Sequence, residues 1–251
     1  MNWLFINSGF NDGKFNMEFD IELARSCKPE EAYFRLYRWS PYCISLGANQ
    51  SFNDVNQDLA SSDKLDVVKR PTGGRAILHA EEITYSVIIP YPQISSAKEI
   101  YQRISTALVK GLEYYNPVLA KADLENSQPN FPKLLNEPSG VLCFGSTAKN
   151  EVKYNGKKLI GSAQRKLDSV ILQHGSILCG TYHKKLVKYI NAGDAIKRSL
   201  ETDINDRTTE IETILNSKVD YELLCNCLKV GFESTWGIIF TDAVTASVNA
   251  K

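Results

Sequence analysis

The chain has 251 residues, of which 43% are hydrophobic and 23% are charged, a composition typical of a globular protein. Its 29 basic and 29 acidic residues cancel, so no overall positive field favours nucleic acid. None of the 6 cysteines forms a pair with CxxC spacing, which argues against the usual zinc motif. A chain of this length can bury a core without disulfides or metals, and we expect a single domain.

The first residues, MNWLFINSGF, lack the charged region and the long apolar region of a signal peptide. No apolar run is long enough to span a bilayer. We therefore expect no membrane association and a location in the cytoplasm, where thiols stay reduced.

In its first half the chain predicts short strands mixed with helices. In chain order we expect a strand at 3–6, a helix at 16–27, strands at 33–39 and 43–46 that pair as a hairpin, a short helix at 55–59, and strands at 65–69 and 83–89. Glu81 and Glu82 form an acidic turn before the last of these strands. Ser96 and Glu99 have the spacing of a capping box, which opens a helix with an apolar stripe at Ile100, Ile104, Leu108 and Leu112.

The second half begins with an irregular segment, 123–139, which is either a mobile lid or an uninvolved surface loop. Asn155-Gly156 predicts a tight turn between two extended segments. Helices are expected at 181–191, 208–215 and 221–236, with a polar connection at 195–206. Without regular βαβ alternation, the predicted fold is α/β of the α+β kind: a mixed β-sheet with flanking helices, and 195–251 as a helical C-terminal extension.

The stretch from Gly140 to Ile177 carries candidate nucleophile chemistry. Cys143 ends an apolar run, and we interpret it as a nucleophile. Side chains alternate along a strand, so only one of Lys157 and Lys158 can face a groove, and we choose Lys158. Solvated surface lysines are the simpler alternative. His174 or His79 could instead serve as a base for Cys143, although a lone histidine in an apolar strand is more often a core residue.

Two glycine-containing segments are candidate binding elements. In Arg70-Pro71-Thr72-Gly73-Gly74-Arg75, adjacent glycines let backbone amides approach a ligand, and the arginines supply donors for a phosphate or carboxylate. The alternative is a tight turn with solvated arginines. This loop is neither GxGxxG nor a P-loop. Gly161-Ser162-Ala163 either keeps a groove open beside the lysines or packs closely against a neighbour.

These segments together resemble the lipoate/biotin protein ligase superfamily. The segment 70–76 with His79 resembles its RRxSGGGAVxH motif, 158–164 resembles KxxGSAQ, and 171–177 resembles the strand that follows. Asn16-Met17 with Asp20, and Ser45-Leu46-Gly47 with Gln50, match further elements. The likeness covers residues 1–191, with Arg75 in place of the third glycine. Cys143-Phe144, followed by Ser146 and Glu151, is most similar to octanoyltransferases of the LipM type.

This resemblance implies transfer of octanoyl from octanoyl-acyl carrier protein, through a Cys143 thioester, to a lysine of a lipoyl domain. Acceptors would be the glycine cleavage H protein or the E2 of a 2-oxoacid dehydrogenase. No metal, nucleotide or other cofactor is expected. Cys143 and Lys158 would be catalytic, and the implied substrate-binding residues are Arg70, Gly73, Gly74, Arg75, His79, Gly161, Ser162, Ala163, His174 and Gly175.

Other functions remain open at this stage. An ATP-dependent lipoate-protein ligase would hold an acyl-adenylate at the Gly73-Gly74-Arg75 loop and Lys158, with Cys143 as a pocket residue. A lipoyl-protein amidotransferase would keep the cysteine and change only the donor. A non-enzymatic module would bind lipoyl domains without forming an acyl-enzyme.

Overall fold

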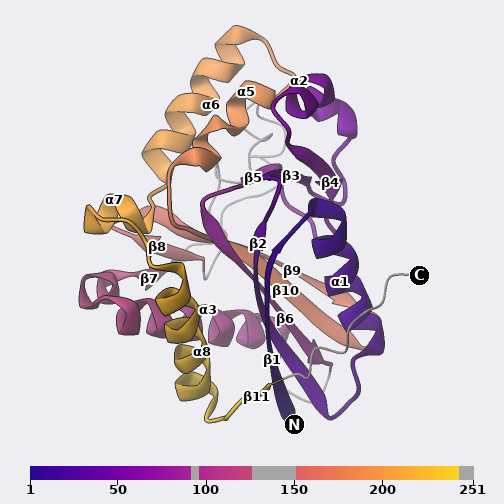
Figure 1. Cartoon of the computed structure of the whole chain (residues 1–251), viewed down its shortest axis with the longest axis vertical. Helices are drawn as coiled ribbons and strands as arrows, with labels where there is room; N and C mark the ends of the chain where they lie inside the picture. The colour runs from indigo at the N-terminus through magenta and orange to yellow at the C-terminus, as the bar shows by residue number, and fades with distance from the viewer. Residues whose placement is uncertain (92–95, 126–150, 243–251) are drawn as a thin grey trace.

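The computed structural model describes residues 1–91, 96–125 and 151–242, and its centre is an eight-stranded sheet (Figure 1). The strands in spatial order are β11 (Thr241–Asp242), β1 (Asn2–Asn11), β2 (Glu31–Trp39), β6 (Glu82–Pro90), β10 (Val170–Leu178), β9 (Lys157–Leu167), β8 (Val152–Tyr154) and β7 (Asp123–Leu124). The pairs β11–β1 and β1–β2 are parallel and the others are antiparallel. The predicted mixed sheet is confirmed.

A separate three-stranded sheet has the order β4 (Asp66–Lys69), β3 (Cys43–Leu46) and β5 (Ile77–His79). The predicted hairpin between 33–39 and 43–46 is therefore wrong, although both strands exist. The reason is that β2 already pairs with β1 on one side and with β6 on the other, which leaves it no free edge. β3 pairs instead with β4 and β5.

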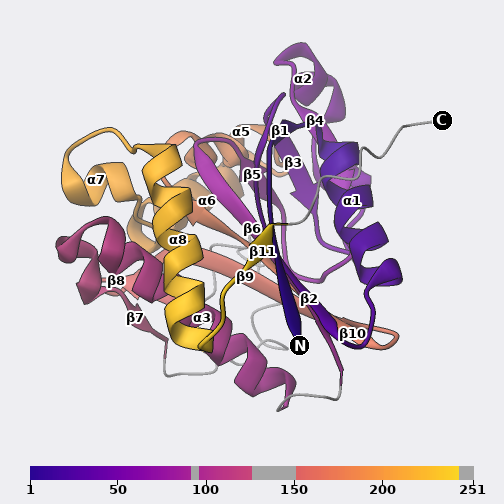
Figure 2. The same cartoon turned by 60° about the horizontal axis from the view of Figure 1, so that its bottom comes forward.

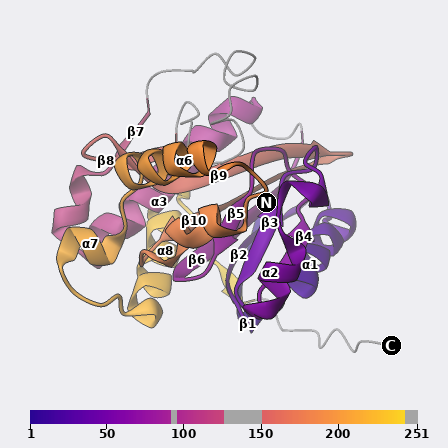
Figure 3. The same ribbon diagram turned by 90° about the horizontal axis from the view of Figure 1, so that it is seen from above.

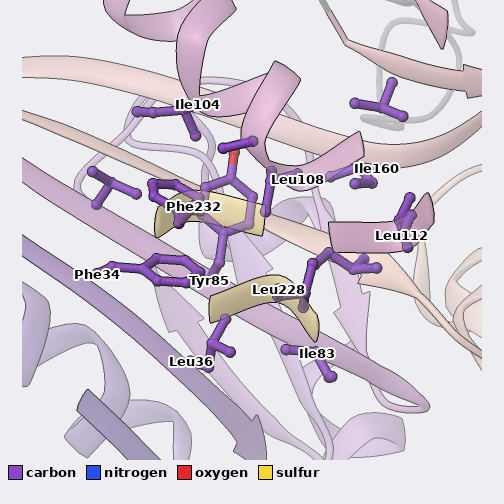
Figure 4. Packing of buried hydrophobic residues seen from close by; sticks show 14 of the residues in the cluster. Phe34, Leu36, Ile83, Tyr85, Ile104, Leu108, Leu112, Ile160, Leu228 and Phe232 are labelled. Carbon is purple, nitrogen blue, oxygen red and sulfur yellow. The ribbon is translucent and has the colours of Figure 1, made fainter. Parts of the chain in front are cut away.

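Two long helices, α3 (Ala97–Tyr115) and α8 (Tyr221–Trp236), cover one face of the large sheet (Figure 2). The predicted capping box of Ser96 and Glu99 opens α3. Gly231 and Gly111 let the helices approach closely, because a Cβ at Gly231 would lie 2.4 Å from the Gly111 nitrogen. Phe232 stacks on Phe34 of β2 at 4.0 Å between ring centroids, inside the main hydrophobic core (Figure 4).

The opposite face of the sheet carries α1 (Gly13–Ser26), whose first turn is capped by Asp12. Ala24 of this helix packs with Ile88 of β6 and with Leu172 of β10. The neighbouring β6 side chains, Val87 and Ile89, point into the main core beneath α3, as strand alternation requires. α1 and the small sheet therefore share one side of the large sheet.

The prediction of a polar connection at 195–206 is wrong, because this segment forms a helix, α6 (Asp194–Arg207). Only Leu200 and Ile204 of this helix are fully buried, so its apolar stripe is too short to stand out in a polar sequence. These two residues join the core beneath the small sheet. α6 runs beside the start of β9 (Figure 3).

The remaining predicted elements are short helical segments and one tight turn. The helix expected at 181–191 is a 3-10 turn, η5 (Tyr182–Lys185), followed by the short α5 (Leu186–Tyr189). Further helical segments are η1 (Phe52–Asp54), α2 (Gln57–Ser62), η2 (Pro117–Lys121) and α7 (Ile211–Leu215). Asn155 and Gly156 have φ of +48° and +76°, which confirms the tight turn between β8 and β9.

Cys143 and the predicted irregular segment beyond residue 125 lie outside the described residues. The division into one domain with an extension at 195–251 stays a prediction; within that range, α8 packs inside the main core and β11 pairs with β1. Among the helices of the described ranges, none is long and apolar enough to cross a membrane.

Candidate active site

A pocket lies between the large sheet, the small sheet and α1. About 360 Å³ of space not filled by protein atoms lies between its walls, a figure that includes the open solvent at its mouth. Its lining residues are Met17 of α1, Tyr37 and Trp39 of β2, Ser45 of β3, Arg70 of the loop after β4, Ile77 and His79 of β5, Thr84 of β6, Gly161, Ser162 and Ala163 of β9, and His174, Gly175 and Ser176 of β10. The pocket therefore joins apolar and aromatic groups to a set of polar groups.

Seven residues predicted for the site line this pocket: Arg70, His79, Gly161, Ser162, Ala163, His174 and Gly175. Gly73, Gly74, Arg75 and Lys158 lie outside its lining. Cys143 falls outside the described residues, so its relation to the pocket stays a prediction. In the structure the loop after β4 lies next to β9 and β10, although this loop is far from both strands in the sequence.

The guanidinium of Arg70 holds its own loop together. It is 3% exposed and donates to the carbonyl oxygens of Gly73 at 3.0 and 3.2 Å and of Arg75 at 2.7 Å. It also donates to the carbonyl oxygen of Ser45 at 2.9 Å. Arg70 therefore shapes the loop from within, and the substrate contact predicted for it stays a prediction.

The loop is also pressed against the turn after β3. A Cβ on Gly47 would lie 2.1 Å from the Gly74 carbonyl oxygen, so no larger residue fits there without movement. Gly74 has φ of +97°, in the region that favours glycine. The Ala48 amide donates to the Thr72 carbonyl oxygen at 2.9 Å, which ties the two segments together.

Both ring nitrogens of His79 have partners inside the protein. Nε2 lies 2.7 Å from Ser45 Oγ, and Nδ1 lies 2.8 Å from Glu82 Oε1. The ring also stacks on Trp39 at 4.2 Å. Burial raises the pKa of the Glu82 carboxyl, but contact with His79 and hydrogen bonds from Thr84 and Ser176 together outweigh burial, so this pKa lies below its ordinary value. His79 is thus a fixed, hydrogen-bonded part of the pocket wall.

His174 connects the loop after β4 to the sheet. Its Nε2 lies 2.6 Å from Thr72 Oγ1, and its Nδ1 lies 3.8 Å from Asp20 Oδ2. Burial lowers the pKa of His174 even though Asp20 acts in the opposite direction. The lowered pKa favours the neutral ring, which hydrogen-bonds Thr72 of the loop and lies beside the Asp20 carboxylate of α1.

Beneath His174 lies a buried ion pair. Arg35 Nη1 donates to Asp20 Oδ1 at 2.8 Å, and both side chains are fully buried. Ser86 Oγ donates to the same oxygen, and Tyr37 OH donates to Oδ2. Burial raises the pKa of the Asp20 carboxyl, but the charge and hydrogen bond of Arg35, together with the neighbouring His174, outweigh burial and hold that pKa below its ordinary value.

The small residues of β9 and β10 both line the pocket and pack closely against neighbours, the two alternatives that the sequence left open. Gly161, Ser162 and Ala163 line the pocket. Gly175 packs closely, because a Cβ there would lie 2.3 Å from the Gly161 carbonyl oxygen and 2.8 Å from Tyr85 Cε1. The Tyr85 hydroxyl of β6 donates to Ser162 Oγ of β9 at 2.7 Å, across the intervening strand β10.

Lys157 and Lys158 take different environments, as alternation along a strand predicts. Lys157 Nζ donates to the Asn205 carbonyl oxygen of α6 at 3.2 Å, on the exposed side. Lys158 is 1% exposed, and its Nζ lies 3.0 Å from Glu151 Oε2. Glu151 Oε1 accepts a long hydrogen bond of 3.5 Å from the Ser162 amide.

Several lining residues were not singled out as site residues from the sequence. Tyr37 and Trp39 alternate along β2 toward this side, but a strand buried on both faces hides such a pattern. Ser45 and Met17 were marked only through the resemblance. Thr84 follows the acidic pair that was expected to form a turn; instead Glu82 begins β6 and is 1% exposed.

Known proteins resemble this chain in sequence. The family described as "Lipoyl protein ligase A/B catalytic domain" matches residues 12–233. The chain is 32% identical to octanoyltransferase LipM of Lysinibacillus sphaericus, over 92% of this chain and 85% of that one. It is 34% identical to octanoyltransferase LipM of Kyrpidia tusciae, over 94% and 87%.

The fold also matches a solved structure. A chain from the structure of an archaeal lipoylation system of Thermoplasma acidophilum, a bipartite lipoate protein ligase and its E2 lipoyl domain, superimposes with a TM-score of 0.77. The match covers 97% of this chain and 87% of that chain at 17% identity. At this identity the likeness establishes the shared fold.

Proposed function

This chain belongs to the family of the lipoyl protein ligase A/B catalytic domain, and we propose that it is an octanoyltransferase. The observation that carries the proposal is an identity above 30% with curated octanoyltransferases over more than nine-tenths of the chain. The donor would be octanoyl-acyl carrier protein, and the acceptor a lysine of a lipoyl domain, in the glycine cleavage H protein or a 2-oxoacid dehydrogenase E2.

In the first step, the Cys143 thiolate attacks the carbonyl carbon of the octanoyl thioester. The new carbon–sulfur bond forms as the bond to the carrier-protein sulfur breaks, and the departing thiolate takes up the proton that Cys143 lost. A free thiol has a pKa of about 8.5, so a nearby cation is needed to populate the thiolate at neutral pH. We assign this part to the Lys158 ammonium.

In the second step, the neutral ε-amine of the acceptor lysine attacks the same carbonyl carbon. A carbon–nitrogen bond forms, the bond to Cys143 Sγ breaks, and the proton lost by the amine returns to the sulfur. Both steps pass through an oxyanion, which an ammonium group or backbone amides can stabilise. Thioester to amide runs downhill, so the reaction needs no nucleotide.

The pocket provides a place for the acyl chain. Met17, Tyr37, Trp39 and Ile77 supply apolar surface, and the polar neighbours of this surface are largely bonded to each other. An alkyl chain gains free energy by leaving water for such a surface, at roughly 25 cal/mol per Å² buried. We place the octanoyl tail there, with its carbonyl toward Lys158.

We also propose a cytoplasmic location. The five cysteines of the described ranges, Cys27, Cys43, Cys179, Cys225 and Cys227, are free thiols. A reducing compartment keeps cysteines in this state.

The test is an acyl-transfer assay without ATP. The purified chain, octanoyl-acyl carrier protein and a lipoyl domain are incubated, and the acceptor is weighed by mass spectrometry. We expect one octanoyl group per lipoyl domain, and no transfer by Cys143→Ala. An absolute requirement for ATP would falsify the transferase assignment and favour a ligase that forms an acyl-adenylate. Transfer from an octanoylated lipoyl protein, but not from the carrier protein, would favour an amidotransferase.

A further inference from the structure

A buried carboxylate contacts both the proposed catalytic amine and the wall of the pocket. Glu151 and Lys158 are 3% and 1% exposed, and Lys158 Nζ lies 3.0 Å from Glu151 Oε2. The second oxygen, Glu151 Oε1, accepts the 3.5 Å hydrogen bond from the amide of Ser162. Ser162 lines the pocket, so Glu151 connects the amine to the place where the acyl group is expected.

The local fold brings these groups together. Glu151 directly precedes β8, and Val152 pairs with Ile160 in antiparallel register. The chain before Val152 therefore runs level with the residues that follow Ile160, which include Ser162. Lys158 is the second residue of β9, and its side chain reaches the Glu151 carboxylate from the other direction.

The burial of this pair has a chemical consequence. A lysine side chain has four flexible carbons, so its amine adopts one position only when a partner holds it. Taking an ammonium out of water is costly, and an opposite charge in contact favours the protonated form. An ammonium, not a neutral amine, is what stabilises a thiolate or an oxyanion.

We propose that Glu151 is a positioning residue: its carboxylate holds the Lys158 amine in place and directs it toward the pocket wall at Ser162. The catalytic consequence rests on the proposed octanoyl transfer, whereas the positioning itself is a property of the free protein. Glu151 acts through Lys158 and contacts neither the donor nor the acceptor.

Glu151→Gln tests this, because glutamine keeps the size of the side chain and an oxygen for Ser162 but removes the charge. We expect kcat for octanoyl transfer to fall at least about tenfold, within the range for losing a stabilising group, while KM for the octanoyl donor stays within about twofold. Glu151→Asp should restore part of kcat because it restores the charge.

A second readout needs no substrate. Reductive methylation modifies accessible amines, and Lys158 is buried against Glu151. Methylation of Lys158, followed by peptide mass spectrometry, should therefore be faster in Glu151→Gln, where the amine is no longer held, than in the wild type. The matched control is Glu125→Gln, which removes the partner of Lys153 on the neighbouring strand β8. In this control Lys153 should be methylated faster, while Lys158 methylation and kcat stay at wild-type values.

Wild-type kcat and wild-type Lys158 methylation in Glu151→Gln would overturn the inference. If Glu151→Gln does not fold, Glu151→Asp decides: its shorter carboxylate should give intermediate values of kcat and Lys158 methylation, and wild-type values of both would count against the proposed role. If the wild-type chain transfers no octanoyl, the proposed function fails, and the methylation rates alone still decide whether Glu151 holds the amine.

Discussion

Replacing Gly47 by alanine should push apart the two segments that shape the pocket mouth. The added Cβ would lie 2.1 Å from the Gly74 carbonyl oxygen and 2.8 Å from the Gly74 carbonyl carbon. Ordinary contacts of a Cβ begin near 3.4 Å. The obstacle is backbone on both sides, so no side-chain rotation relieves it, and the loop must move by about an ångström.

The expected cost follows from these contacts. Overpacking of a well-packed site costs about 1–3 kcal/mol. Movement of the loop also weakens the 2.9 Å hydrogen bond from Ala48 to Thr72, worth about 0.5–1.5 kcal/mol. Together these give a loss of about 2–4 kcal/mol in the free energy of unfolding, or on the order of 10 °C in Tm for a chain of this size.

Gly73→Ala is the matched control for stability. Among the residues that the structure describes, a Cβ at Gly73 would meet no atom within 4 Å, and Gly73 does not have a positive φ. Its free energy of unfolding should change by less than about 0.5 kcal/mol. Urea or thermal unfolding measures both variants, and octanoyl transfer by Gly47→Ala should fall about 100-fold because Thr72 shifts from His174. Equal stability of the two variants would refute the close contact between Gly47 and the loop.

Two further predictions concern charged groups. Lys158→Ala should reduce octanoyl transfer by at least about 100-fold. Lys157→Ala removes only an exposed contact to α6 and should retain most activity in the same assay. Comparable losses in the two variants would show that the choice of Lys158 is unsupported. The pKa of Asp20 is lower in the folded than in the unfolded protein, so its ion pair with Arg35 stabilises the fold at any pH above the unfolded pKa of about 3.9. This stabilisation is lost as the pH falls through the folded pKa. Asp20→Asn should therefore cost about 3–5 kcal/mol in urea unfolding at pH 7 and progressively less below pH of about 4; a pH-independent cost would contradict this.

Local patterns predicted the elements that depend on local interactions. The capping box at Ser96, the turn at Asn155-Gly156 and the helix at 221–236 are all present, because caps, turn conformations and apolar stripes are properties of neighbouring residues. The failed hairpin is non-local, whereas the helix α6 was missed because its apolar stripe is short. Whether β2 pairs with β3 depends on β1 and β6 occupying both edges of β2, which the segment itself does not reveal.

The candidate site shows the same division. Motifs marked the loop at 70–76 and the strands β9 and β10, and seven predicted residues line one pocket. The direction of each side chain was not predictable, since Arg70 binds the carbonyls of its own loop. Glu82 resembled part of a solvated turn, yet it forms a buried pair with His79, because a charge next to a strand gives no sign of its eventual partner.

The central claim is that Cys143 carries the octanoyl group as a thioester, and intact mass spectrometry tests it most directly. The chain is mixed with octanoyl-acyl carrier protein, without nucleotide and without acceptor. We predict that the protein gains the mass of one octanoyl group, that hydroxylamine removes it, and that Cys143→Ala never acquires it. An unmodified wild-type protein that nevertheless octanoylates a lipoyl domain, or equal labelling of Cys143→Ala, would contradict the account.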